Sequence, residues 1–314
     1  FKEYVQYLEK SHVVIYEGGM GKKLFILAAV IFFSGMFINI GSYFLFPDVA
    51  GLAKKNPTKT AFMEYREREW QREGKKKKIQ QRWVSLIRIS PYVIKAVIIA
   101  EDDKFWGHEG FDFEAMQKAL EKDIQKGKFK AGGSTISQQL AKNLYLSPSK
   151  NPVRKLKEAI LTWRIEKRLS KKRIIELYLN VAEWGDGIFG IEMAARAHFG
   201  KTAADLSAQE AARLAAVLPN PRKFNPAGAS RYVVSRSERI YRIMVKRGIV
   251  IPEYEDVMKE QSDLGSLLES REPEAIKKLE QKVEEWKKEG ADAGGGTQTP
   301  TTAPGDRNGG VDRD

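Results

Sequence analysis

The feature that most constrains this chain is an uncharged, apolar stretch near its start, LFILAAVIFFSGMFINIGSYFLF, at residues 24–46. At about 1.5 Å per residue in a helix, the stretch is long enough to cross a hydrocarbon layer of roughly 30 Å. Lys22 and Lys23 precede it, and Pro47 follows it. The run is longer than that of a signal peptide and no small-residue cleavage site follows it closely, so we expect a single-pass membrane anchor.

The charges that flank this stretch leave its orientation open. Within about 20 residues, the basic side chains before it are Lys10, Lys22 and Lys23, and those after it are Lys54, Lys55, Lys59 and Arg66. This difference is too small for the positive-inside rule to assign a side. The run Met20-Gly21-Lys22-Lys23 is typical of the start of a membrane anchor, so we expect residues 1–19 to be an upstream extension.

The composition indicates an anionic partner. The 314 residues carry a formal net charge of +13 and an isoelectric point of about 9.6, which suits phospholipid, nucleic acid or a phosphorylated substrate. The chain has no cysteine, which excludes disulfides, thiolate metal sites and cysteine nucleophiles. His12, His108 and His198 have no recognisable metal-binding spacing, and we expect structural or surface roles for them.

The rest of the chain divides by composition into a body and its flanks. Residues 47–83 contain REREWQREGKKKK and predict a juxtamembrane connector: a solvated helix, a linker or a segment lying on anionic headgroups. Residues 84–251 carry apolar residues at three- and four-residue spacing, which predicts a mainly α domain. Residues 252–289 predict a charged helical extension, and residues 290–314 predict a disordered tail.

The first candidate site is IIAEDDKFWGHEGFD, residues 98–112, where acids follow an apolar run. A helix that starts at Pro91 brings Glu101 into phase with the apolar stripe, with Asp102 at its edge and Asp103 pointing away. A carboxylate in apolar surroundings has a raised pKa, which suits it to proton transfer. The alternative is that Glu101 lies in a fraying last turn and reaches solvent.

The second candidate site is GGSTISQQLAKN, residues 132–143. Ser134 or Thr135 can cap a helix that follows the two glycines, and bare amides at a helix N-terminus attract anions. One side of this helix is a polar row that suits sugars and phosphates, made of Thr135, Gln138, Gln139 and Lys142. The segment is not a P-loop, because GK[ST] is missing, and an ordinary amphipathic helix is the alternative.

The third candidate site is RKLKEAILTWRIEKRLS, residues 154–170. Its apolar residues mark two faces of a helix, which predicts a helix central to its domain. Glu158 falls on one of these faces, so we expect it to be partly enclosed and surrounded by Arg154, Lys155 and Lys157. The alternative is a plain surface pair between Glu158 and Arg154, four residues apart.

Two short patterns resemble known motifs but lack their context. GDGIFG, residues 185–190, satisfies GxGxxG, yet the segment before it predicts a helix rather than the strand of a dinucleotide site. SPSK, residues 147–150, matches SxxK, but no SDN or KTG follows and Pro148 disrupts the helix that such a serine needs. We therefore expect neither dinucleotide binding nor serine acyl transfer.

In this order and spacing, EDDKFWGHEG, GGSTISQQLAKN and RKLKEAILTWRIE closely resemble three signature motifs of family 51 glycosyltransferases, the peptidoglycan glycosyltransferases that polymerise lipid II. Residues 177–201 and 210–226 extend the resemblance, which covers roughly residues 85–247. With one span and no room for a transpeptidase domain, the chain resembles the monofunctional enzymes. The resemblance implies a lysozyme-like helical domain behind a single transmembrane helix.

The resemblance also implies roles for individual residues. Glu101 is expected to be the general base and Glu158 the second essential carboxylate. The residues expected to bind substrate are Ser134, Gln138, Gln139, Lys142, Asn143, Lys150, Arg154 and Lys157, with Lys142 on the pyrophosphate. The residues expected to build the motifs are Asp102, Phe105, His108, Gly110, Gly132 and Gly133. Many family members have arginine where this chain has Lys150, which loses a bidentate phosphate contact.

The implied reaction is an inverting transfer in which Glu101 removes the proton of an acceptor sugar hydroxyl. Its implied partners are lipid II, the growing undecaprenyl-pyrophosphate glycan strand, membrane lipid and other cell-wall synthesis proteins, but no nucleic acid. Mg²⁺ or Mn²⁺ commonly assists the family, although no ligand set is readable here. The implied location is the bacterial inner membrane, with residues 1–23 in the cytoplasm and the catalytic domain on the periplasmic side.

Two other functions fit parts of the sequence. A lysozyme-like peptidoglycan hydrolase is also helical and also uses paired carboxylates. A membrane-anchored basic protein would bind nucleic acid or anionic lipid through residues 64–83 without catalysis.

Overall fold

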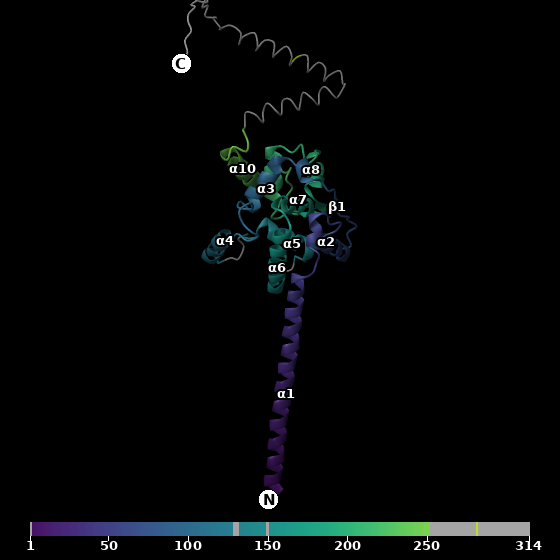
Figure 1. The fold of residues 1–314 in the computed structure, drawn as a ribbon, viewed down its shortest axis with the longest axis vertical. Coiled ribbons are helices and arrows are strands. Elements are labelled where there is room, and N and C mark those ends of the chain that lie inside the picture. Colours follow the sequence, from purple (N-terminus) through teal and green to yellow (C-terminus); the bar gives the residue numbers. More distant parts are fainter. Residues whose placement is uncertain (1, 128–131, 149–150, 252–280, 282–314) are drawn as a thin grey trace, which may run out of the picture. The chain divides into compact units, whose positions relative to one another are not determined.

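The structure, a computed structural model, describes residues 2–127, 132–148, 151–251 and 281, with side chains from Gly21 onwards. The mainly α prediction is confirmed (Figure 1). The helices of the described residues are α1 (Lys2–Gly41), α2 (Ala61–Arg72), α3 (Pro91–Glu101), α4 (Phe113–Lys126), α5 (Ile136–Tyr145), α6 (Pro152–Arg168), α7 (Lys171–Val181), α8 (Ile191–Phe199), α9 (Ala208–Val217) and α10 (Arg231–Lys246). Short 3-10 helices span Ser42–Phe44, Ala50–Ala53 and Leu86–Arg88.

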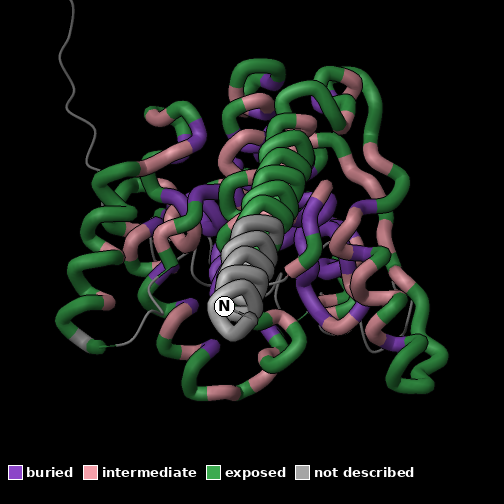
Figure 2. Tube along the Cα trace, turned by 90° about the horizontal axis from the view of Figure 1, so that it is seen from below, coloured by how far each residue is buried: buried purple, intermediate pink, exposed green. Residues whose placement is uncertain are grey.

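The apolar stretch near the start forms a helix that is long and apolar enough to cross a membrane. The candidate span is Gly21–Phe44, with a mean hydropathy of 2.3, and none of it is buried inside the protein. Figure 2 shows α1 largely exposed along its described length, whereas the buried segments gather in the body of the domain. The α-helix ends at Gly41, five residues before the predicted end of the span, and continues as the 3-10 helix Ser42–Phe44.

The end of the anchor is fixed to α6. Arg164 donates hydrogen bonds to the carbonyl oxygens of Tyr43 (2.9 Å) and Leu45 (3.0 Å). The ring of Phe44 packs edge-on against Trp163, which is 48% exposed. Of the two apolar faces predicted for this helix, one is buried in the domain. The other contacts the end of the anchor and is only partly covered, with Val153 and Ile160 half-buried and Leu156 and Trp163 exposed.

Two groups of helices build the core of the domain. Helix α3 packs against α9 and α10, and α9 is lined with alanines whose small side chains allow close approach. Helix α5 packs against α2, α6 and α7, with Ile136 and Leu140 fully buried. As predicted, α3 begins at Pro91, and the two groups meet where its last residue, Glu101, contacts α5.

The predicted connector is largely part of the domain. Thr60 caps α2 by accepting a hydrogen bond from the amide of Met63 (3.2 Å), and Met63 and Trp70 are each only 1% exposed. The strand β1 (Gln80–Gln81) then pairs in parallel with β3 (Ile188–Phe189). The charge density of residues 47–83 concealed this packing, because two apolar side chains are enough to bury one face of a short helix.

The segment GDGIFG forms a hairpin. Strand β2 (Glu183–Gly185) follows α7 directly and pairs antiparallel with β3, giving a three-stranded sheet in the order β1-β3-β2. Gly187 in the turn has φ +87°, a backbone conformation that side chains disfavour. The rejection of a dinucleotide site agrees with this geometry, since the glycines serve a turn between short antiparallel strands.

Several predictions lie outside the described residues. These are the substrate contact of Lys150, the extension at residues 252–289 apart from Gln281, and the tail at residues 290–314.

Candidate functional site

Glu101, the last residue of α3, lies at the meeting point of the two helix groups. Its side chain is 11% exposed, and its Oε2 accepts a hydrogen bond from Nε2 of Gln139 on α5 (2.9 Å). Burial raises the pKa of this carboxyl above its ordinary value, while the Gln139 hydrogen bond and the charges of Arg236 and Lys142 oppose the shift. The predicted burial of Glu101 is thus confirmed, and the alternative of a solvent-exposed fraying turn is wrong.

The three neighbouring acids have separate surroundings. Asp102, predicted at the edge of the stripe, is more deeply buried than Glu101, with a side chain that is 2% exposed. Its oxygens accept from the amide of Ile136 at the start of α5 (2.9 Å) and contact Nε2 of His108 (2.8 Å). Nδ1 of His108 accepts from the amide of Gly110 (3.0 Å), so Nε2 carries the proton and donates to Asp102. Asp103 is exposed and pairs with Arg247.

Asp102 and His108 therefore join the first motif to the second, and their predicted structural roles agree with these contacts. Phe105 is fully buried and extends the same core. Gly110 has φ +92°, and a Cβ there would approach side-chain atoms of Thr162 and Glu166 at 2.9 Å. Its carbonyl also accepts from the hydroxyl of Thr135 (2.7 Å), so the turn is fixed from both sides.

Helix α5 begins with a capping box. The hydroxyl of Thr135 accepts from the amide of Gln138 (3.2 Å), and the side chain of Gln138 accepts from the amide of Thr135 (2.9 Å). Gln138 is only 2% exposed, and its side-chain oxygen is committed to the helix start, so the expected substrate contact of Gln138 stays a prediction that rests on its amide nitrogen. Ser134, one residue earlier, is exposed and lies 3.4 Å from Nζ of Lys155.

The two glycines before the cap do not adopt left-handed backbone conformations. Gly132 is exposed, and a Cβ built on it meets nothing within 4 Å. A Cβ on Gly133 would lie 3.3 Å from Cβ of Ala119 and 3.4 Å from Cα of Met116, so Gly133 permits close packing against α4. Both line a hollow that Glu101 and Ser134 also line.

Gln139 links Glu101 to a residue that the sequence did not single out. Its Nε2 donates to Glu101, while its Oε1 accepts from the hydroxyl of Tyr178 on α7 (3.0 Å). Tyr178 is 1% exposed, and burial raises its pKa well above the ordinary value, so it stays a donor. This chain orients the Gln139 amide so that its nitrogen faces the carboxylate.

Glu158 is buried on α6, as predicted, with 3% exposure. Its Oε2 lies 2.6 Å from Nη1 of Arg154, and its Oε1 is paired with Lys155. Lys157, which the sequence placed among these cations, instead lies with Nζ 4.7 Å from the ring centre of Tyr43 at the end of the anchor. The helical spacing explains the correction: Lys155 is three residues from Glu158 on the same face, whereas Lys157 is its immediate neighbour and points elsewhere.

Lys142, on α5, interacts electrostatically with both carboxylates. Burial lowers the pKa of Lys142 from its ordinary value, and the negative charges of Glu158 and Glu101 oppose that effect. The positive charges of Arg154 and Lys155 lower the pKa of Lys142 further. One lysine thus experiences both acids and both of the cations that neutralise Glu158.

Beside Lys142 lies a cavity to which the predicted connector contributes. Its lining includes Phe62 and Arg66 of α2, Gln139, Lys142 and Asn143 of α5, and Tyr178 of α7. Residues 218–222 close another side. Asn143, predicted to bind substrate, is 7% exposed on this wall.

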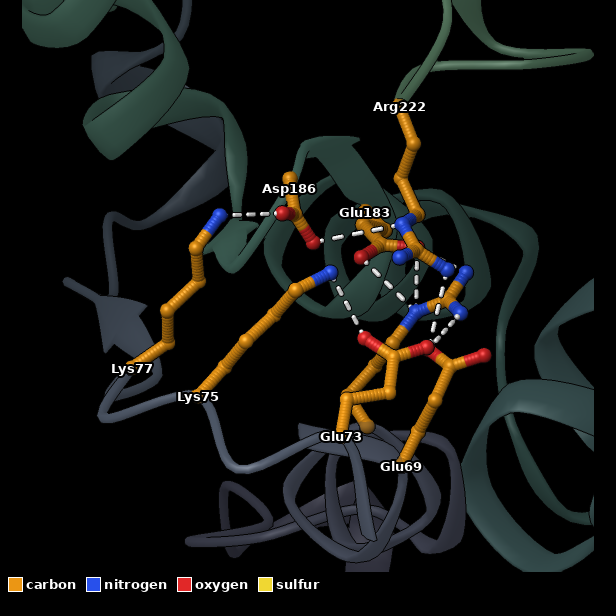
Figure 3. A network of polar contacts seen from close by, with 8 residues as sticks. Glu69, Glu73, Lys75, Lys77, Glu183, Asp186 and Arg222 are labelled. Atoms are coloured by element: carbon orange, nitrogen blue, oxygen red, sulfur yellow. Dashed lines mark hydrogen bonds and ion pairs between the residues drawn. The ribbon is translucent and has the colours of Figure 1, made fainter. Parts of the chain in front are cut away.

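Three residues of the cavity lining, Arg66, Glu183 and Arg222, belong to a charge network, part of which Figure 3 labels. Arg66 donates to both oxygens of Glu183 through Nε (3.0 Å each) and to Oε2 through Nη2 (2.7 Å). Glu69 accepts from Arg66 (2.8 Å) and from Arg222 (2.9 Å), and Nε of Arg222 lies 3.2 Å from Oδ1 of Asp186. The network holds α2, the hairpin and residues 218–222 together, a long-range arrangement that no local sequence pattern indicated.

The side chains of the site do not fit a divalent cation held by the protein alone. Among the described residues, no three His, Cys, Asp or Glu side chains gather where they could hold a metal ion. Both oxygens of Glu158 face cationic side chains, and Glu101 accepts from Gln139, whereas Mg²⁺ and Mn²⁺ need available oxygen ligands.

Comparison with known proteins gives consistent matches. A family model described as Transglycosylase matches residues 67–245, more than half of the chain. A protein of Aromatoleum aromaticum named biosynthetic peptidoglycan transglycosylase is 48% identical over 227 residues, 71% of this chain and 96% of that protein. Proteins of the same name from Methylobacillus flagellatus and Dechloromonas aromatica are 46% identical over 198 residues (63% and 86% of the two chains) and 53% identical over 170 residues (54% and 74%).

Proposed function

Because the chain belongs to the transglycosylase family, as a monofunctional peptidoglycan glycosyltransferase, we propose that it polymerises lipid II into linear glycan strands. The donor is the growing strand, linked through an α bond to undecaprenyl pyrophosphate. The acceptor is the 4-hydroxyl of N-acetylglucosamine in lipid II. The product is a β-1,4 bond, formed with inversion.

One observation carries the proposal: Lys142 lies within electrostatic reach of both Glu101 and Glu158. A base and a cationic anion site side by side are what attack on a sugar–pyrophosphate bond requires. Glu101 is buried, and its nearest cation, Arg236, lies 3.5 Å away, a looser pairing than that of Glu158, which suits a base. Glu158 has Arg154 and Lys155 in contact, which suits a charged anchor for pyrophosphate-binding cations.

The reaction then runs as one displacement. Glu101 takes the proton of the acceptor 4-hydroxyl as its oxygen bonds to the anomeric carbon of the donor. The bond from that carbon to the pyrophosphate oxygen breaks, and the electron pair leaves with undecaprenyl pyrophosphate. Lys142, with Arg154 and Lys155 held by Glu158, stabilises the departing negative charge, a contribution of about 10²–10³ in rate at comparable sites.

The same geometry favours transfer over hydrolysis. An inverting hydrolase needs a carboxylic acid opposite the base to protonate an alcohol leaving group. Pyrophosphate leaves as an anion and needs cations instead. Glu158, the second of the two candidate catalytic glutamates, is paired with two cations, which supports the transferase and argues against a role as a proton donor.

We further propose a bacterial inner-membrane location with the catalytic domain on the periplasmic side. The candidate span Gly21–Phe44 is consistent with a single-pass anchor, and a polyprenyl substrate stays in the bilayer. Arg164 ties the end of that anchor to α6, which also carries Glu158. The chain has no cysteine, so an Ile87→Cys variant, at a position 94% exposed, tests the side: an impermeant maleimide should label it from the periplasm.

The expected Mg²⁺ or Mn²⁺ would then arrive with the substrate, since pyrophosphate oxygens supply the ligands that the side chains lack. Added Mg²⁺ should raise the polymerisation rate without raising the Tm of the substrate-free protein. A Tm that rises with Mg²⁺ alone would contradict this assignment.

The deciding experiment is polymerisation of purified lipid II by the full chain in detergent or proteoliposomes. Wild type should yield glycan strands that a muramidase digests, since that digestion requires β-1,4 bonds. Glu192→Gln is the matched control: Glu192 is a buried, ion-paired carboxylate on α8, outside the site. Folded wild type that makes no polymer, or that degrades preformed strands, would overturn the proposal.

A further inference from the structure

Helix α10 supplies a cation to the end of α3. Nη2 of Arg236 lies 3.3 Å from the carbonyl oxygen of Ala100 and 3.5 Å from Oε1 of Glu101. The Arg236 side chain is 21% exposed, and its Nε is buried without a hydrogen-bond partner among the described residues. Arginine is therefore held in this place although one of its donors is unsatisfied, a cost that calls for a compensating role.

The carbonyl contact fixes the turn that carries Glu101. Ala100 is in the last turn of α3, where carbonyl groups have no partner within the helix. A guanidinium there satisfies such a carbonyl and interacts favourably with the negative end of the helix. The same nitrogen faces the carboxylate, so the backbone and the side chain of this turn are held by one group.

The other charged and polar groups near Glu101 come from segments other than α10, which carries Arg236. From α5, Gln139 and Lys142 face it, and from α7 the Tyr178 hydroxyl reaches it through Gln139. Asp102 follows it in the chain and adds a repulsive negative charge.

Charged side chains on the remaining neighbouring elements are engaged elsewhere. On α9, Arg213 donates to the carbonyls of Pro226 and Gly228, and Glu210 is paired with Lys201. In the hollow in front of Glu101, Lys104 and Lys118 are both paired with Glu114.

We propose that Arg236 is a positioning residue for the general base: it fixes the last turn of α3 and holds the Glu101 carboxylate ionised and oriented toward the acceptor hydroxyl. This assignment rests on the proposed function. It gives the cations of the site two roles: Lys142, with Arg154 and Lys155, stabilises the leaving group, and Arg236 positions the base.

The test is the pH dependence of kcat/KM for lipid II polymerisation. In Arg236→Ala the carboxylate loses a nearby positive charge, so the pKa of Glu101 rises and the acidic limb of the profile should move up by about one pH unit. Polymerisation at neutral pH should fall about tenfold through kcat, with KM little changed. Arg236→Lys keeps the positive charge, so its acidic limb should lie close to the wild-type position.

Arg247→Ala is the matched control. Arg247 follows the same helix and pairs with exposed Asp103, two residues from Glu101, so this variant also removes one positive charge near the motif. Because that pair is exposed and screened, the limb should stay at its wild-type position. If Arg236→Ala fails to fold, Arg236→Gln removes the charge while keeping a polar side chain, and the same upward shift is expected.

The outcomes separate the two proposals. Wild type that polymerises, with an unmoved acidic limb in folded Arg236→Ala or Arg236→Gln, overturns the role of Arg236 alone. A lower kcat without a shifted limb has the same meaning, since a purely structural cap would give that result. Folded wild type that makes no polymer overturns the proposed function and this role with it.

Discussion

Glu101 and Glu158 are both almost withdrawn from solvent, with side chains 11% and 4% exposed, but they are neutralised in different ways. Glu158 contacts Arg154 and Lys155 on its own helix. Glu101 has a neutral amide in contact and its nearest cation, Arg236, 3.5 Å away. Burial without close pairing raises the cost of the ionised form, so Glu101 is the acid whose charge is easily changed.

The difference shows that the position of a carboxylate on a helix does not define its chemistry. Both acids fall in phase with an apolar face, and sequence spacing treats them alike. What separates them is which cations the neighbouring helices bring, and at what distance. If the difference in pairing is also a difference in role, substitutions at the two acids and at their cations should have different effects on polymerisation.

The largest effect is expected for Glu101→Gln. Glutamine keeps the shape of the side chain but cannot accept a proton, so the polymerisation rate should fall by about 10³. Initial rates with lipid II, beside the Glu192→Gln control, measure it. A Glu101→Gln enzyme within tenfold of wild type would show that another group is the base.

The second effect concerns Lys142, the cation shared by both acids. Wild-type kcat/KM should follow a bell in pH, with an acidic limb above the ordinary glutamate pKa and a basic limb below the ordinary lysine pKa, because burial moves the two groups toward each other. Activity requires Glu101 deprotonated and Lys142 protonated, so it is lost at both ends.

Lys142→Arg identifies the basic limb. Arginine stays protonated throughout, so the limb should disappear, while the peak rate falls about tenfold because the guanidinium replaces a compact ammonium in a buried place. A basic limb that survives in Lys142→Arg would assign it to a different group.

The third effect separates two lysines that the sequence did not distinguish correctly. Lys155→Ala removes a cation from Glu158 and should lower kcat/KM about tenfold, whereas Lys157→Ala removes a contact with Tyr43 and should change it less than threefold. Both positions lie on α6 and lose the same charge, so each controls for the other. Equal losses would support the substrate contact that the sequence predicted for Lys157.

Local sequence patterns predicted part of the fold and of the site. The mainly α fold, the start of α3, the candidate span and the burial of both glutamates follow from helical periodicity, proline placement and apolar length, which are local patterns. The residues of the predicted polar row of α5 have two different surroundings. Gln138 forms part of the capping box, whereas Gln139 and Lys142 line the cavity. A capping box is itself a local pattern, so the TxxQ spacing could have predicted this role of Gln138.

Other features depend on contacts between residues far apart in the sequence, and helical periodicity does not predict such contacts. Tyr178 is 39 residues from Gln139, and Arg236 is 135 residues from Glu101. The pairing of Arg66 with Glu183 spans 117 residues and makes α2 part of the site, although its charge density had predicted a connector. Lys157 was assigned by adjacency to Glu158, and helical geometry turned it away.

The smallest effect is one of stability, and its sign differs between the two acids. The pKa of Glu101 is raised in the folded protein, so the folded state binds more protons than the unfolded state between the ordinary glutamate value and the raised one. Stability contributed by this group is therefore present at low pH and lost as the pH rises through that range. At pH 7 the ionised carboxylate opposes folding, and Glu101→Gln should raise Tm by about 1–3 °C even as it removes activity.

Glu158→Gln removes the partner of two cations and should lower Tm by about 2–5 °C, a moderate loss because Lys155 is 46% exposed and can reach water. Thermal unfolding of both variants beside wild type at pH 7 measures the two shifts. If both substitutions lower Tm equally, Glu101 is as well compensated as Glu158, and the contrast in pairing has no energetic meaning. Opposite signs would show that the fold tolerates a buried, loosely paired acid at the end of α3, which is the expected cost of keeping a base there.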